Sequence, residues 1–130
     1  MQFNWITFDP PKQKPRVLPL HVGITKYGHL TINYTAYRAM GHPEAVLPLF
    51  DPSNTLIGLK PVYPTTPRAK HLRQRKDRRF SYWICVREFC NYFGLPYKKG
   101  IIIDRIESHN DGTLVLYLDP STKYFRRTDG

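Results

Sequence analysis

The chain twice ends a short helix-like stretch with a glycine that a proline follows two residues later, at Gly41 and Pro43 and again at Gly94 and Pro96. A glycine permits the left-handed backbone that closes a helix, and a proline stops the helix from resuming. Twelve prolines in 130 residues also argue against long helices elsewhere. The pattern therefore predicts short helices between short strands and frequent turns.

The order of elements around these two stops is the same. Residues 22–62 read as strand, short helix, strand, turn and strand, and residues 80–120 repeat that order. We interpret them as tandem copies joined by a basic linker at 63–79, within a single domain that spans residues 1–130. One copy has too few strands to bury its own apolar faces, so we expect the two copies to share a core.

The sequence GHLTINYTAYRAMG, followed by AVLPLFDPSNTLIGLKP, resembles the AbrB/MazE/SpoVT swapped-hairpin family. That family has a Gly-Arg loop, an apolar strand, a short helix that ends in Leu-Gly, and a strand hairpin. Gly28 matches the first glycine, residues 34–41 match the helix, and residues 46–60 match the hairpin. His29 stands where the family has Arg, and Asn33 stands where it has Pro.

The resemblance implies a β-rich α+β fold, namely a pseudo-symmetric, swapped-hairpin-like barrel made by two strand-helix-hairpin repeats of one chain. Members of the family are typically dimeric DNA-binding regulators or antitoxins, so a homodimer is an open alternative here. The loop that meets DNA in the family corresponds to Gly28 and its neighbours. The resemblance therefore implies DNA contacts at Lys26 and His29.

Most of the excess positive charge lies in one segment. The formal net charge is +10, and residues 60–80 carry eight basic and one acidic side chain. Such a cluster attracts nucleic-acid phosphates, because binding releases condensed counterions, and flanking aromatic residues add stacking surfaces for bases. The candidate contacts in this run are Arg68, Lys70, Arg73, Arg75, Lys76, Arg78 and Arg79. The alternative interpretation of the run is a solvated linker.

Other classes of function have little support in the sequence. Histidines and carboxylates are scattered, no phosphate-binding glycine motif occurs, and the spacing of Cys85 and Cys90 fits no zinc site, so we expect neither catalysis nor a cofactor or metal. We expect both thiols to be buried. No apolar run is long enough to span a membrane, and no secretory signal is evident, so a cytoplasmic location is expected.

The sequence thus predicts a nucleic-acid-binding protein, a DNA-binding transcriptional regulator or antitoxin-like protein that uses its basic run as an arm. Two alternatives remain open at this point. One is a non-enzymatic interaction module, or a subunit of a larger complex, whose basic run meets an acidic protein partner. The other is an RNA-binding protein that uses the aromatic residues beside the run.

Overall fold

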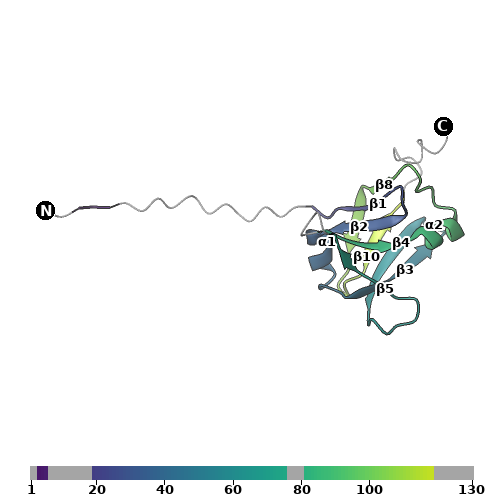
Figure 1. Cartoon of the computed structure of the whole chain (residues 1–130), viewed down its shortest axis with the longest axis horizontal. Coiled ribbons are helices and arrows are strands. Elements are labelled where there is room, and N and C mark those ends of the chain that lie inside the picture. The colour runs from purple at the N-terminus through teal and green to yellow at the C-terminus, as the bar shows by residue number, and fades with distance from the viewer. Residues whose placement is uncertain (1–2, 6–18, 76–80, 119–130) are drawn as a thin grey trace.

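The computed structural model of the chain describes residues 3–5, 19–75 and 81–118. That part of the chain is rich in β-structure, with two antiparallel five-stranded sheets and a short helix at each end of the body (Figure 1). The helices are α1 (Tyr34–Ala39) and α2 (Arg87–Phe93). The β-rich α+β class predicted from the sequence is therefore confirmed.

The first sheet has the strand order β6-β7-β2-β1-β8. Its strands are β6 (Arg73–Gln74), β7 (Ser81–Cys85), β2 (His29–Asn33), β1 (Val22–Ile24) and β8 (Ile101–Ile103). The second sheet has the order β5-β3-β4-β10-β9. Its strands are β5 (Lys70–His71), β3 (Ala45–Asp51), β4 (Leu56–Val62), β10 (Leu114–Tyr117) and β9 (Arg105–Ser108).

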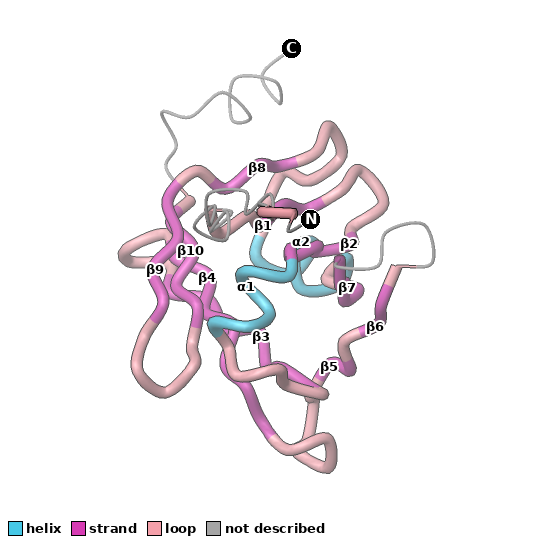
Figure 2. Tube along the Cα trace, turned by 90° about the vertical axis from the view of Figure 1, so that its left-hand side faces the viewer, coloured by secondary structure: helices cyan, strands magenta, loops and turns pink. Residues whose placement is uncertain are grey.

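The two sheets do not close into one barrel, in contrast to the sequence-based prediction. Figure 2 shows β4, β9 and β10 on one side of the body and β2, β6 and β7 on the other. Single residues separate β5 from β6, at Leu72, and β8 from β9, at Asp104. The chain passes from one sheet to the other at these two corners, where strands bend instead of continuing one ladder. The single strand predicted between the helix and the turn of residues 80–120 is therefore divided into β8 and β9, in different sheets.

Strands from the two halves of the sequence pair directly with each other. β2 pairs with β7 over five residues, from His29 opposite Cys85 to Asn33 opposite Ser81. β1 pairs with β8, and β4 pairs with β10. The central strands of both sheets therefore depend on hydrogen-bonding partners from the other half of the sequence.

Apolar side chains from both halves form one core. Leu30 and Ile32 of β2 alternate with half-buried residues, as expected for a strand with one face covered. Ile84 of β7 and Leu116 of β10, at 2% and 0% exposed, are buried as deeply as Leu30 and Ile32. All four belong to a single cluster of buried side chains. Neither half therefore has a complete core of its own.

Both helices end where the glycines predict. Gly41 and Gly94 have φ values of +82° and +67°, in the left-handed region. Gly94 is the C-cap residue of α2, and Gly41 directly follows Met40, the C-cap of α1. At the other end of α1, Asn33 is the N-cap, because its side chain accepts a hydrogen bond from the backbone N–H of Ala36 at 3.0 Å.

Replacing Gly94 with Ala is expected to lower the free energy of unfolding by about 1–2 kcal/mol, because an L residue is strained in left-handed backbone. A Cβ there would have no neighbour within 4 Å, so the whole cost is conformational. Gly58→Ala is the control, since a Cβ at this strand position would lie 3.7 Å from Leu49 in ordinary contact. Equal thermal stability of the two variants would contradict the left-handed backbone conformation at Gly94.

Separate expression of residues 16–63 and 78–120 is expected to give two segments without a cooperative thermal transition. Each segment lacks the partner strands and half of the core described above. Co-expression of the two segments should restore a folded complex. A cooperative melt of either segment alone, followed by circular dichroism, would show that the shared core is not required.

Candidate nucleic-acid interface

The loop between β1 and β2 is tied by hydrogen bonds of its own. The N–H of Thr25 donates to the carbonyl of His29 at 2.8 Å, and the N–H of Gly28 donates to the carbonyl of Thr25 at 2.9 Å. The hydroxyl of Thr25 also accepts from the N–H groups of Tyr27 and His29, each at 3.3 Å. Gly28 has a φ of +78°, which favours glycine at this turn. The loop therefore has a fixed backbone.

Arg87, at the start of α2, donates hydrogen bonds to the same loop. Its Nε and Nη2 donate to the carbonyl of Tyr27 at 3.2 and 2.9 Å. The N–H of Val86 donates to the carbonyl of Gly28 at 2.8 Å. A Cβ at Gly28 would lie 2.8 Å from the Cβ of Arg87, so only glycine fits without a shift. The loop in the first half of the sequence is thus hydrogen-bonded to residues at the start of α2 in the second half.

Trp83 joins this loop to the basic run. Its ring stacks on His29, with centroids 4.3 Å apart and an angle of 25° between the planes. The guanidinium carbon of Arg73 lies 5.6 Å from the centroid of the same ring, in a cation–π contact. The pairing of β2 and β6 on either side of β7 produces this arrangement, since Trp83 lies opposite both Thr31 and Arg73.

An open hollow of about 300 Å³ lies at this junction. We call it the basic hollow, and its lining residues are Thr25, Lys26, Tyr27, His29, Thr31, Arg75 and Trp83. None of these residues carries a carboxylate, whereas Lys26 and Arg75 bring positive charge from two distant parts of the sequence. The hollow therefore combines cations, hydroxyls and aromatic rings on one surface.

The electrostatic environment keeps His29 neutral near pH 7. Burial lowers the pKa of its imidazole below the usual value of 6.5, and the nearby positive charges of Arg87 and Arg75 lower it further. A neutral ring stacks on Trp83 without adding a third positive charge beside those of Lys26 and Arg75. The positive charge of the basic hollow at neutral pH therefore comes from Lys and Arg side chains.

The structure brings together only some of the residues that the sequence singled out. Lys26, His29, Arg73 and Arg75 meet around Trp83. Arg68 and Lys70 line a separate, larger groove beside α2. The remaining candidates, Lys76, Arg78 and Arg79, lie outside the described residues.

Part of the basic run is built into the sheets instead of forming a separate arm. Lys70 and His71 form β5 beside β3, and Arg73 and Gln74 form β6 beside β7. Two-residue strands of this composition carry no period-2 apolar signal, so only the partner strands define them. Residues 70–74 thereby hold their side chains at fixed places on the two sheet edges.

Several residues of the basic hollow were not among the predicted contacts. Thr25 and Tyr27 flank Lys26 in the loop before β2, and Thr31 lies two residues after His29, so the alternation of side chains along β2 could have indicated that His29 and Thr31 share a surface. Trp83 was considered only as a flanking aromatic residue. The role of Arg87 has no signal in the sequence, because it depends on where α2 packs.

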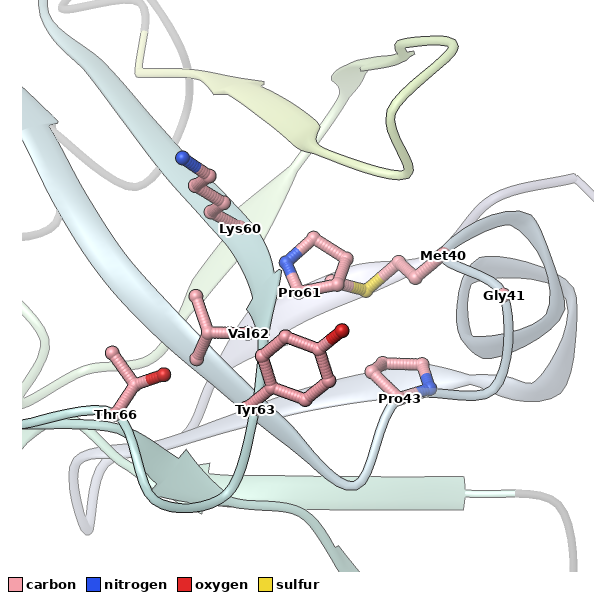
Figure 3. A pocket seen from close by; sticks show the side chains of 8 residues that line it. All are labelled: Met40, Gly41, Pro43, Lys60, Pro61, Val62, Tyr63 and Thr66. Carbon is pink, nitrogen blue, oxygen red and sulfur yellow. The ribbon is translucent and has the colours of Figure 1, made fainter.

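Two further hollows are less suited to a polyanion. Figure 3 shows one of about 500 Å³, lined by Met40, Gly41, Pro43, Lys60, Pro61, Val62, Tyr63 and Thr66. Its lining is mostly apolar, and Lys60 is its one charged residue. The other, which we call the apolar groove, has about 920 Å³ between α2, β3 and residues 67–70. Its lining includes Phe50, Phe89 and Phe93, whose rings contact one another.

The two thiols differ in exposure, so the prediction that both are buried is wrong for one of them. Cys90 lies in the core on α2 and is 0% exposed, and burial raises the pKa of its thiol to about 11. Cys85 is exposed on β7, opposite His29. It shares the outward face of β7 with Trp83 because side chains alternate along a strand.

Comparisons of the chain with protein-family models, curated proteins and solved structures found no match. The resemblance to the swapped-hairpin family therefore stays a prediction from the residues quoted above. Within the described residues, neither helix has the length and apolar character needed to cross a bilayer. No cluster of His, Cys, Asp or Glu that could hold a metal ion occurs among residues 3–5, 19–75 and 81–118.

A thiol reagent at pH 8 is expected to modify Cys85 quickly and to leave Cys90 unmodified in the folded protein. Exposure makes the first thiolate accessible, while burial and a raised pKa suppress the second. Mass spectrometry should show one added group in the native state and two after denaturation. Cys85→Ser should abolish the fast reaction, and rapid double labelling of the native wild type would contradict the buried position of Cys90.

Proposed function

We propose that this protein binds nucleic acid as a non-enzymatic, cytoplasmic DNA-binding regulator or antitoxin-like protein. Phosphates would be contacted by Lys26, Arg73 and Arg75 around the stacked pair of His29 and Trp83. DNA is preferred over RNA because the resembled family binds DNA.

One observation carries the proposal: cations from two sequence-distant segments converge on a surface that already contains stacked aromatic rings. A solvated linker would have no reason to place Arg73 over Trp83 or Arg75 beside the Gly28 loop. Arg and Lys side chains that neutralise phosphates raise the affinity of a protein for nucleic acid through counterion release, and Arg also stacks on aromatic rings.

The internal arrangement supports a duplicated swapped-hairpin unit as the origin of this surface. When Gly41 is laid on Gly94, β2 falls on β7, and when Thr55 is laid on Thr113, β4 falls on β10. These superposed strands are the ones that pair with each other, and both pairings are antiparallel. A twofold axis between two repeats produces such pairings. We propose that the two halves of the chain are related to each other as two members of the resembled family are in a dimer, without closing into one barrel.

The apolar groove favours a second candidate function. Leu49, Tyr92 and Phe93 are exposed there, and Arg68 and Lys70 lie at the same groove. This combination suits an apolar protein segment that carries carboxylates, as in the interaction module considered above. In that case the groove, and not the basic hollow, would hold the partner.

Replacing Arg73 and Arg75 together with Ala is expected to weaken binding to duplex DNA and to reduce its dependence on salt. Each cation that neutralises a phosphate contributes about 0.9 to the slope of log K against log salt, so the slope should flatten by about 1.8. Fluorescence anisotropy at several salt concentrations measures both changes. Bound DNA should also protect Cys85 from the thiol reagent.

The control variant replaces Arg38 and Lys60, which are exposed on α1 and β4, with Ala. It has the same net charge as the test variant but leaves the basic hollow intact. If both variants lose the same affinity and slope, the binding is diffuse and the proposed surface is wrong. If wild type binds neither DNA nor RNA, the protein-interaction candidate takes precedence.

A further inference from the structure

Three aromatic rings run in a row from the Gly28 loop into the first sheet. The ring centroids of Tyr27 and His29 are 6.4 Å apart, and those of His29 and Trp83 are 4.3 Å apart. A cation lies at each end of the row. The Nζ of Lys26 is 5.2 Å from the Tyr27 centroid, and the guanidinium carbon of Arg73 is 5.6 Å from the Trp83 centroid. We call these three rings the aromatic row.

Tyr27 is the solvent-exposed end of the aromatic row. It is 60% exposed, whereas His29 and Trp83 are half-buried and cover each other. Its backbone is nevertheless fixed, because its carbonyl accepts both hydrogen bonds from Arg87 and its N–H donates to Thr25. The loop thus presents an exposed ring on a rigid backbone, so little conformational entropy is lost when a flat group stacks on it.

The size of the basic hollow limits what can fill it. About 300 Å³ lies at the lower end of the range for small-ligand pockets, which suits one planar group with its attached chain. Two hydroxyls line the hollow: that of Thr25 accepts two backbone hydrogen bonds and can still donate to the edge of such a group, whereas that of Thr31 donates to the carbonyl of Gly23 at 3.5 Å and can accept from that edge. Lys26 and Arg75 line the same hollow, so their positive charges can attract the phosphates next to such a base.

Stacking of a base on an exposed aromatic side chain distinguishes single-stranded from duplex nucleic acid. In a duplex, neighbouring bases cover both faces of each base, so an aromatic side chain at the surface finds no free face to stack on. Unpaired bases expose their faces, and proteins that bind single strands combine a basic groove with aromatic platforms. We infer that the basic hollow binds an unpaired base of a single-stranded nucleic acid, stacked on Tyr27 at the end of the aromatic row. This inference rests on the proposed function, because it specifies the ligand of the same surface.

The test compares labelled oligomers of about 12 nucleotides, within the usual site size, as single-stranded DNA, single-stranded RNA and duplex DNA. Fluorescence anisotropy at two salt concentrations gives the dissociation constants for wild type, Tyr27→Leu and Tyr27→Phe. Tyr63→Leu is the matched control, because Tyr63 is 83% exposed and lies at the hollow of Figure 3. Thermal melting of each variant establishes that the fold is retained.

We expect wild type to bind a single strand more tightly than the duplex. Tyr27→Leu should weaken single-strand binding roughly tenfold, in the range for loss of one base–aromatic stack, and leave duplex binding unchanged. Tyr27→Phe keeps the ring and should stay within about twofold of wild type, as should Tyr63→Leu. Whichever of the DNA and RNA single strands binds more tightly identifies the source of the base.

Two results would overturn the inference without touching the proposed function. One is a duplex that binds as tightly as either single strand, and the other is single-strand binding that Tyr27→Leu leaves unchanged. If no oligomer binds to wild type at either salt concentration, the inference and the proposed function both fail.

Discussion

The ladder between β2 and β7 is the interaction on which the rest of the structure depends. It joins the two halves of the sequence at the centre of the first sheet, from His29 opposite Cys85 to Asn33 opposite Ser81. The buried side chains on one face of this ladder, Leu30 and Ile84, belong to the common core. Its other face carries His29 and Trp83 in contact. One set of backbone hydrogen bonds therefore fixes both the core and the candidate interface.

The interface is assembled from parts that are each incomplete without the others. The Gly28 loop needs Arg87 of α2 to hold its carbonyl, and glycine is required because a Cβ would meet Arg87 at 2.8 Å. Arg73 needs β7 beside it to lie over Trp83. Since the loop, the helix and the strand come from different parts of the chain, the surface exists only in the folded protein. Its rigidity lowers the entropic cost of binding a ligand.

Local sequence rules predicted the elements well and their connections less well. The helix stops at Gly41 and Gly94 were predicted correctly, because helix capping depends on a few neighbouring residues. One strand was predicted between the helix and the turn of residues 80–120, yet the chain bends at Asp104 and continues in the second sheet. A corner of this kind depends on which strands lie on either side, and the sequence of the corner itself contains no signal for it.

The sequence by itself determined that the chain is β-rich, has two short helices with defined ends, and concentrates its positive charge in one run. These properties follow from local backbone preferences and from composition. Only the tertiary structure decided which charges act together. It separates Arg68 and Lys70 from Arg73 and Arg75, and it brings Lys26 to the latter pair across some fifty positions of sequence. The physical reason is that strand pairing, and not proximity along the chain, sets which side chains share a face.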